Sequence, residues 1–380
     1  MDIDFVVRSD AQVKSGGDSI QVEEYRSELQ MRGHDVRVIP FSPSMSLRKT
    51  AVIHFVNLDR PFDYLVGSSL AAGQPRVISP IHHDLQRIRL MRRNERGYGF
   101  RSLIGRFLPE NGREFLAFFV RGLIADRSIR GRMQLVKASL SVARHIPGIW
   151  ARVGVELNRM DRVLLLANGE GHSIQRDTGW AGHNSELVPN GRPSVTIDDS
   201  VAWVDRSESL LCVGRIEPRK RQLDIARAAV ALGVRVTFVG DLVKPDSSFG
   251  IDFLEQVGTS SVLEWLGPLP REETLVRMNH SRVLVNASWV EVQSLVDLEA
   301  SFLGCWVIAT PAGNSREWLP ESVQETEGFS VDGLLSRAVN LLGATAGPPP
   351  VAYEWTWSDA GSSLADLYEG LRSRFSPSAG

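Results

Sequence analysis

Two cations in the segment VGRIEPRKR have the types and the spacing that binding of an anion needs. Arg215 and Lys220 stand five residues apart, at and just after the end of a strand-like run. Ligands of open α/β sheets bind at the carboxyl ends of the strands, so both side chains can converge on one anion there. Fixed cations stabilise the negative charge that develops on a leaving group such as pyrophosphate, without a metal. The alternative interpretation is a solvated basic turn.

Two carboxylates in the segment EVQSLVDLE are separated by seven residues. We expect Glu291 in a loop before a helix and Glu299 about one turn into that helix. The amide N–H groups of Ser294 and Leu295 would then lie at a helix N-terminus, which favours a phosphate group. An ionised carboxylate accepts two or more hydrogen bonds, which suits the hydroxyls of a ribose and a sugar. The alternative is a helix-capping carboxylate together with an unrelated surface carboxylate.

The elements that must position these residues form two α/β sets. Strand-like runs alternate with helix-period segments, which predicts parallel sheets with helices on both faces. The first set of expected strands covers residues 4–9, 36–40, 51–56, 76–81, 162–168 and 185–191. The second set covers residues 209–215, 234–240, 262–267, 282–288 and 306–310, and its expected helices cover 220–232, 271–279 and 294–303. A polar linker near 192–206 separates the sets, and a final amphipathic helix is expected over 358–375, with Ser358 as its N-cap.

Composition excludes several classes of protein. The chain of 380 residues has a net charge of −2, 43% hydrophobic and 23% charged residues, which is typical of a soluble globular protein. Its two cysteines make no disulfide framework and no zinc site, and we expect no metal and no cofactor. The acidic N-terminal sequence is unlike a signal peptide, and no apolar run reaches the roughly 20 residues of a membrane span, so we expect a cytoplasmic protein. The absence of GxGxxG after the first strand, and of P-loop, HExxH and GxSxG motifs, weakens dehydrogenase, kinase, zincin and hydrolase interpretations.

The motifs, taken together and in this order, resemble those of the retaining glycosyltransferases of family 4. The specific part of the resemblance is the set of VGR…K, Glu-x7-Glu and VPNG at 188–191. It is supported by SGGDSIQVEEYRSELQMRGHDVRVI, IHHD at 81–84, WLG at 265–267, EASFLGCWVIAT and the final helix. The resemblance implies the GT-B fold, with two Rossmann-like parallel-sheet domains facing each other across a cleft. The acceptor-side domain would be 1–194 and the nucleotide-sugar domain 195–352, with segment 353–380 crossing back as a helix onto the first domain.

The resemblance also implies a role for individual residues. The implied catalytic residues are His83, Glu291, Arg215 and Lys220, with the two cations on the donor diphosphate and Glu291 on sugar hydroxyls. His83 would hydrogen-bond near the anomeric centre, with His82 as its neighbouring competitor. The implied donor-binding residues are Gly16, Gly17, Arg215, Lys220, Leu266, Glu291, Ser294, Leu295 and Glu299.

Each donor-binding position has its own expected contact. Glu299 would bind the ribose, and the backbone near Leu266 would meet the base. The amides around Ser294 would cap a phosphate. Gly16 and Gly17 would let the backbone of the first domain approach the donor phosphate, since a side chain would push it back.

Val292 and Gln293 depart from the small, Pro or Gly residues that usually follow the first glutamate of the family. The expected activity is transfer of a sugar, with retention, from a nucleotide-diphosphate sugar to a hydroxyl acceptor of a cell-envelope glycan, a glycolipid or a natural product. A sugar-nucleotide epimerase of similar two-domain fold is one alternative. The departure at 292–293 motivates the other, a non-catalytic nucleotide-sugar-binding protein.

Charge is segregated along the chain. Segment 85–152, an insertion expected in the first domain, contains 14 Arg and one Lys against four acids, or +11, whereas the rest of the chain carries −13. This charge favours an anionic or lipid-linked acceptor, or peripheral contact with the inner face of a membrane. A packed amphipathic helical pair with solvated arginines and a dimer interface are the alternatives, and nucleic acid is not expected. The residues of the membrane hypothesis are Arg87, Arg89, Arg92, Arg93, Arg96, Arg101, Arg106, Phe100, Phe107, Phe115, Phe118 and Phe119.

Overall fold

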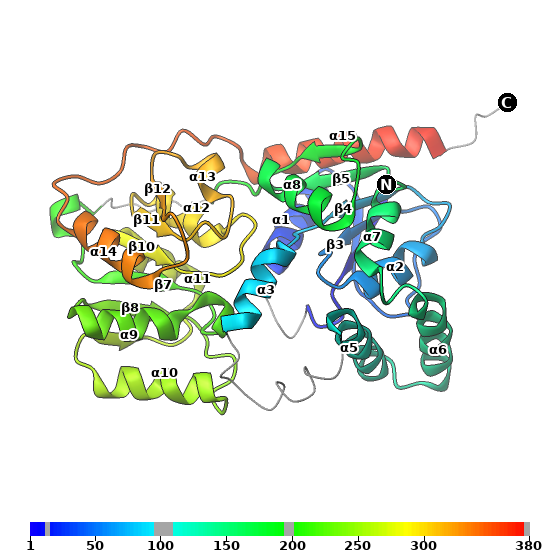
Figure 1. Cartoon of the computed structure of the whole chain (residues 1–380). Coiled ribbons are helices and arrows are strands. Elements are labelled where there is room, and N and C mark those ends of the chain that lie inside the picture. The colour runs from blue at the N-terminus through cyan, green and yellow to red at the C-terminus, as the bar shows by residue number, and fades with distance from the viewer. Residues whose placement is uncertain (12–15, 95–108, 194–200, 376–380) are drawn as a thin grey trace. The chain divides into compact units, whose positions relative to one another are not determined.

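The structure is a computed structural model that describes residues 1–11, 16–94, 109–193 and 201–375, in two α/β units (Figure 1). The first unit contains the described residues of 1–84, 109–191 and 355–375. The second unit contains those of 85–94 and 192–354. Each unit has its own hydrophobic core.

The first unit is built on a six-stranded parallel sheet in the order β2-β1-β3-β4-β5-β6. All five residues of β3 are buried, as expected for a strand covered by helices on both faces. Every strand overlaps a predicted run, because buried parallel strands are recognisable as short, nearly continuous apolar segments. The strands are β1 (Asp2–Val7), β2 (Asp35–Pro40), β3 (Val52–Val56), β4 (Arg76–Ser79), β5 (Arg162–Leu165) and β6 (Ser185–Leu187).

Helices pack around this sheet and extend from it as a hairpin (Figure 1). The hairpin consists of α5 and α6, which approach closely at Gly122, where an added Cβ would lie 2.4 Å from the Leu135 side chain. It rests on α2 and adds Phe118, Leu135 and Val142 to the core of the first unit. The helices are α1 (Gly17–Met31), α2 (Pro61–Leu70), α5 (Glu110–Ala125), α6 (Ile129–Ala143), α7 (Ile149–Leu157) and α8 (Asn168–Thr178).

Part of the membrane hypothesis is wrong. Phe118 is 1% exposed, so its ring is not available to a lipid surface, and Phe115 and Phe119 are partly buried against the same core. The Phe62 ring lies 5.3 Å from that of Phe115 and 6.0 Å from that of Phe118, between centroids. Helix α3 (Leu85–Asn94), which carries Arg87, Arg89, Arg92 and Arg93, groups with the second unit rather than the first. Arg96, Arg101, Arg106, Phe100 and Phe107 lie outside the described residues.

The C-terminal helix α15 (Trp357–Phe375) belongs to the first unit and packs on α1. The VPNG motif holds its start: Trp355 Nε1 donates to the Pro189 carbonyl at 3.0 Å, and an added Cβ at Gly191 would lie 2.2 Å from the Trp357 nitrogen. Further along the helix, the Tyr368 hydroxyl lies 2.6 Å from His54 Nδ1 on β3. The helix is therefore fixed at both of these points.

The predicted N-cap of this helix is wrong by two residues. The Thr356 hydroxyl accepts the Asp359 amide at 3.1 Å, while the Asp359 carboxylate accepts the Thr356 amide at 2.8 Å, which is a reciprocal capping arrangement. Ser358 lies inside the first turn, where its hydroxyl and carbonyl accept from Arg32. Thr, Ser and Asp all cap helices, so only the backbone geometry decides which of Thr356, Ser358 and Asp359 is the N-cap.

His54 makes the stability of the first unit depend on pH. Full burial lowers its pKa from 6.5 to about 3, while Ser79 and Tyr368 hydrogen-bond its ring. The unfolded chain therefore takes up this proton below pH 6.5 and the native chain does not, so stability present above pH 6.5 is lost as the pH falls. We expect wild type to lose about 1 kcal/mol more unfolding free energy than His54→Gln between pH 7 and 5.5.

Urea unfolding at both pH values measures this difference. Other titrating groups, such as the buried Glu170, are common to both proteins and cancel in it. An equal loss in the two proteins would contradict the assignment.

The second unit is built on a six-stranded parallel sheet in the order β12-β11-β10-β7-β8-β9. Five of these strands overlap predicted runs, whereas β12, α10, α13 and α14 were not predicted. The strands are β7 (Leu210–Val213), β8 (Val236–Val239), β9 (Leu263–Trp265), β10 (Val283–Asn286), β11 (Trp306–Ala309) and β12 (Val323–Glu325). The helices are α9 (Gln222–Leu232), α10 (Ser248–Thr259), α11 (Arg271–Asn279), α12 (Leu295–Phe302), α13 (Ser315–Trp318) and α14 (Val331–Leu342).

Candidate functional site

Two glycines bring the carboxyl ends of β7 and β8 together. Gly214 and Gly240 have φ values of +139° and +144°, and an added Cβ at Gly240 would lie 2.0 Å from the Gly214 carbonyl oxygen. Only glycine combines this backbone conformation with so close an approach. The Ile216 amide then donates to the Asp241 carbonyl at 2.7 Å. The loop that begins at Arg215 is thereby anchored to the sheet edge.

Two arginines of the loop pair with one acid, Glu217. The Glu217 carboxylate lies 3.4 Å from Arg215 and 3.0 Å from Arg219. Arg219 also donates to the Val290 carbonyl at 3.0 Å, and its own carbonyl accepts the Trp289 amide at 2.9 Å. Arg219 therefore ties the cationic loop to the segment that follows β10.

Lys220 and Glu291 meet directly as an ion pair. Their side chains are 15% and 14% exposed, so the pair is largely removed from water. Burial raises the pKa of Glu291, but Lys220 and Arg219 outweigh it and lower that pKa to about 2. The Lys220 stem passes 3.9 Å from the position of a Cβ on Gly214, beside Arg215. An ammonium has three donors, so Lys220 can hold Glu291 and an anion at the same time.

The N-terminus of α12 lies next along the chain. The Ser294 hydroxyl caps the helix by accepting the Asp297 amide at 3.2 Å. The amides of Ser294 and Leu295 meet no acceptor in the part of the chain that the structure describes. Asn286 and Ser315 hold the Asp297 carboxyl at 2.8 and 2.7 Å, and burial raises its pKa.

A small hollow separates Glu291 from the neighbouring strand ends. Burial raises the pKa of Glu325 in its wall, against Arg316 and Arg87, which lower it. The lining residues of the hollow are Asn286, Glu291, Asp297, Ala309, Thr310, Ala312, Gly313, Ser315 and Glu325.

Glu299 and Leu266 are engaged within the second unit. Arg271 on α11 donates to the Glu299 carboxylate at 3.0 Å, and Glu299 is 9% exposed. The Leu266 amide donates to the Phe238 carbonyl at 3.0 Å, which extends β9 by one residue along β8. Arg271 thereby fixes the position of the Glu299 carboxylate within the second unit.

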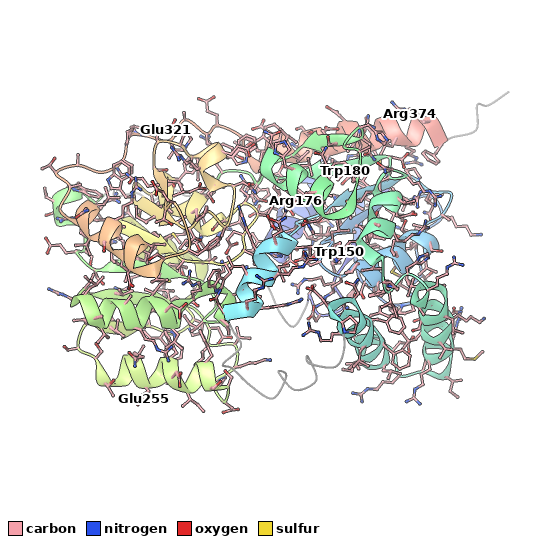
Figure 2. The ribbon with its side chains drawn as sticks, in the orientation of Figure 1. Trp150, Arg176, Trp180, Glu255, Glu321 and Arg374 are labelled. Carbon is pink, nitrogen blue, oxygen red and sulfur yellow. The ribbon has the colours of Figure 1, made fainter. Side chains whose placement is uncertain are left out.

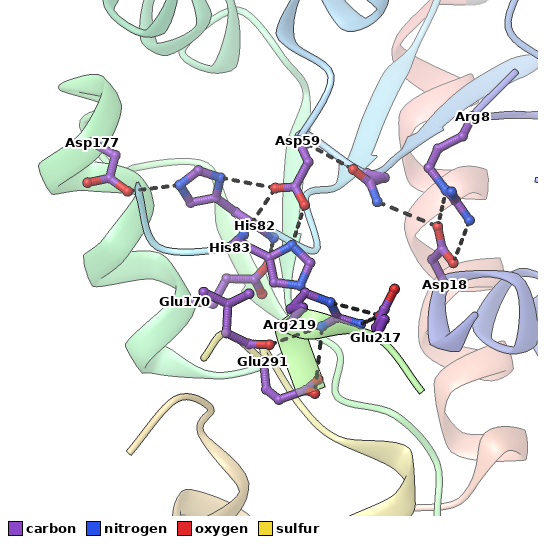
Figure 3. A network of polar contacts seen from close by, with 12 residues as sticks. Arg8, Asp18, Asp59, His82, His83, Glu170, Asp177, Glu217, Arg219 and Glu291 are labelled. Atoms are coloured by element: carbon purple, nitrogen blue, oxygen red, sulfur yellow. Dashed lines mark hydrogen bonds and ion pairs between the residues drawn. The ribbon is translucent and has the colours of Figure 1, made fainter. Parts of the chain in front are cut away.

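In the first unit, His83 lies between β4 and α3 and is held by Asp59, which follows β3 (Figure 3). The Asp59 carboxylate accepts the His83 amide at 3.1 Å and contacts Nδ1 of the ring. Burial raises the pKa of Asp59, but the charge of His83 and its hydrogen bonds outweigh burial and lower it. An ionised Asp59 selects the tautomer with the proton on Nδ1, which directs Nε2 as the acceptor.

Asp177 and Trp150 hold the ring of His82. Its Nε2 lies 3.0 Å from Asp177 on α8, and Trp150, labelled in Figure 2, packs on its ring at 5.4 Å between centroids. Beneath it, the buried Glu170 carboxyl accepts the amides of His82 and Leu166 at 2.9 and 2.7 Å. Burial outweighs these hydrogen bonds and raises the pKa of Glu170 to about 7. His82, which is 2% exposed, is therefore a packed residue, whereas His83 is the more accessible of the two.

Gly16 and Gly17 stand at the N-terminus of α1, directly after the undescribed residues 12–15. Gly16 is extended and its carbonyl accepts the Ser19 and Ile20 amides. Asp18 in the first turn pairs with Arg8 at 2.5 Å. The N-terminus of α1 thus carries an ion pair between Asp18 and Arg8.

Several residues of the site escaped sequence reasoning. They are Glu217 and Arg219 in the second unit and Asp59, Glu170 and Asp177 in the first. Asp59 alone gave a usable signal, since it follows an expected strand closely, as binding residues of parallel sheets do. Among the described residues, no group of three His, Cys, Asp or Glu is placed to hold a metal ion.

Comparison with known proteins shows the fold. Residues 196–334 match the family model of the glycosyl transferases group 1. A search of curated protein sequences finds no significant match. Three solved structures of similar fold are a sucrose-phosphate synthase from Thermosynechococcus elongatus, the glycosyltransferase AviGT4 involved in avilamycin A biosynthesis, and WaaG, a glycosyltransferase involved in lipopolysaccharide biosynthesis.

These likenesses extend over whole chains at low identity. The synthase has a TM-score of 0.59 and 14% identity over 98% of this chain and 97% of its own. AviGT4 has a TM-score of 0.55 and 15% identity over 98% of each chain, and WaaG has a TM-score of 0.51 and 14% identity over 100% of each chain. The predicted fold class, α/β with two parallel-sheet units of GT-B type, is confirmed.

Proposed function

We propose that this protein is a retaining glycosyltransferase that moves a sugar from a nucleotide-diphosphate sugar to a hydroxyl group. The observation that carries the proposal is the meeting of Lys220, in the loop that holds Arg215, with Glu291, which stands just before α12. The Ser294 and Leu295 amides at the start of α12 meet no acceptor among the described residues. Cations and helix-end amides suit a diphosphate, and a carboxylate held ionised suits sugar hydroxyls. The match of residues 196–334 to a glycosyl transferase family supports the same interpretation.

In the proposed reaction the bond between the anomeric carbon and the diphosphate oxygen breaks while the acceptor oxygen bonds to that carbon on the same face. The departing phosphate oxygen takes the acceptor proton. Arg215 and Lys220 stabilise the charge that develops on the diphosphate, and the proposal uses no metal. Glu291 and the amides of Ser294 and Leu295 position the donor, Glu299 holds the ribose and the backbone near Leu266 meets the base. His83, Gly16 and Gly17 act from the first unit.

A panel of donors tests this proposal. We expect one class among UDP-, GDP-, ADP- and dTDP-sugars to raise the melting temperature. At 100 times its dissociation constant, a true donor adds about 2.7 kcal/mol to stability. Free mannose and glucose serve as controls, and the measurement is repeated with EDTA. No shift with any nucleotide sugar would contradict the proposal.

Release of nucleoside diphosphate separates the alternatives. A transferase or a slow donor hydrolase releases it, and an epimerase turns over without net release. A non-catalytic binding protein shows the thermal shift without turnover. Only the first result is compatible with the proposed function.

A further inference from the structure

Helix α6 exposes an apolar stripe on the side opposite its buried face. Its buried residues Gly131, Leu135, Ser139 and Val142 recur at helical spacing and face the first unit. A second stripe with the same spacing faces solvent. It consists of Ile129, Met133, Val136 and Leu140, which are 81%, 57%, 50% and 72% exposed. Since residues three and four apart share one helix face, these four side chains form a continuous row.

The preceding helix α5 carries a similar row. Leu116, Val120, Leu123 and Ile124 are 48%, 45%, 38% and 65% exposed. The two helices are joined by a short turn and pack together at Gly122 and Leu135. Single exposed hydrophobic residues are normal on protein surfaces, but eight on one hairpin mark a surface that contacts another apolar phase.

The charges beside the α6 row have one sign. Residues 127–144 contain Arg127, Arg130, Arg132, Lys137 and Arg144 and no acid. At 100° per residue, Arg132 borders one side of the row and Lys137 and Arg144 border the other. All five are exposed, and among the described residues none of them pairs with a carboxylate. The nearest acid, Asp126, is engaged by the Ser44 hydroxyl at 2.5 Å and the Ser128 amide at 2.9 Å.

We propose that the α5–α6 hairpin docks this protein on an anionic lipid surface. The aliphatic row enters the headgroup boundary and the bordering cations contact lipid phosphates, as in helices that lie in the membrane interface. The inference is independent of the proposed function. It also replaces the aromatic contacts expected from the sequence with aliphatic ones. No described helix has the length and apolar character of a membrane span, so the contact is one of surface docking.

A second copy of the chain fits this surface poorly. A two-fold interface places the same patch on both subunits, so the cations of one α6 would face those of the other without acids to balance them. An apolar surface bordered by one sign of charge fits a phase of the opposite charge instead. The phosphates of an anionic lipid layer provide that charge next to an apolar interior.

Co-sedimentation with vesicles tests the inference. We expect the full chain to bind phosphatidylcholine vesicles that contain phosphatidylglycerol, and to bind less in high salt. The double variant Arg130→Gln/Lys137→Gln should lower the partition coefficient about 30-fold, at about 1 kcal/mol per cation. Ile129→Ser/Leu140→Ser should lower it about tenfold or more through lost apolar contact.

Matched variants on the second unit provide the controls. Arg235→Gln/Arg277→Gln removes two exposed cations, and Ile251→Ser/Leu254→Ser removes two exposed aliphatic side chains on α10. Both should bind as wild type does, and far-ultraviolet circular dichroism confirms that each variant is folded. Equal binding to neutral and anionic vesicles, or no binding, would overturn the inference. So would a dimer in sedimentation equilibrium that Ile129→Ser/Leu140→Ser dissociates.

Discussion

Lys220→Ala is expected to lower the kcat of sugar transfer by about 10²–10³-fold, the usual effect of removing one preorganised group that stabilises developing charge. The loss should fall mainly on kcat, because the diphosphate becomes more negative as its bond to the sugar breaks. The variant also leaves Glu291 with Arg219 at 3.7 Å as its remaining cationic neighbour, so the pKa of Glu291 should rise. Initial rates over a range of donor concentrations measure the effect.

Lys244→Ala is the matched control for this experiment. Lys244 is an exposed lysine of the same unit, outside the site. Its substitution should leave kcat and KM unchanged. If Lys220→Ala melts as wild type does and also transfers sugar as wild type does, Lys220 has no part in the reaction.

Asp59→Asn should lower transfer by about 10²-fold or more, because it removes the carboxylate that selects the tautomer of His83. An asparagine amide can donate to Nδ1 and move the ring proton to Nε2, where it opposes an accepting role. His83→Ala should have an equal or larger effect. Because Asp59 acts through His83, the double variant should be no slower than His83→Ala alone.

The pH profile of kcat and one control variant distinguish a positioning role of Asp59 from a purely structural one. Asp59→Asn should change the pH dependence of kcat as well as its value, whereas a purely structural defect would lower the rate equally at every pH. His183→Ala, at an exposed histidine of the same unit, should transfer as wild type does. Additive losses in the double variant would show that Asp59 acts independently of His83.

Local patterns predicted most of the fold. The strands of both sheets, except β12, overlap runs of buried apolar residues, and a parallel sheet follows from their alternation with helices. The three-residue β12 and the four-residue α13 were missed, because such short segments carry little periodic signal. Helices α10 and α14 were also missed, although the buried residues of α14 recur at helical spacing. The N-cap of α15 was misplaced because Thr356 and Ser358 are both good capping residues.

The sequence predicted which residues contribute to the site, but it did not predict which of their side chains contact each other. Nothing in the sequence shows that Lys220 meets Glu291, that Arg271 meets Glu299 or that Asp59 holds His83. These partners are 71, 28 and 24 residues apart. The first and third pairs meet because the neighbouring strands β7 and β10, or β3 and β4, end at one edge of a parallel sheet, and the second meets because α11 packs on α12.

The charge of segment 85–152 follows from the sequence, but the face that it borders depends on tertiary packing. Phe118 is buried while Ile129 and Leu140 are exposed, although all three are large and apolar. Amphipathic spacing shows that a helix has an apolar side, but α6 has two, and packing against the first unit covers only one of them. By itself the sequence thus determined the alternation of strands and helices, the cations and carboxylates at their ends and the segregation of charge. Only the tertiary structure decided which charges neutralise each other and which apolar row remains exposed, because both depend on which side chains the folded chain brings within contact distance.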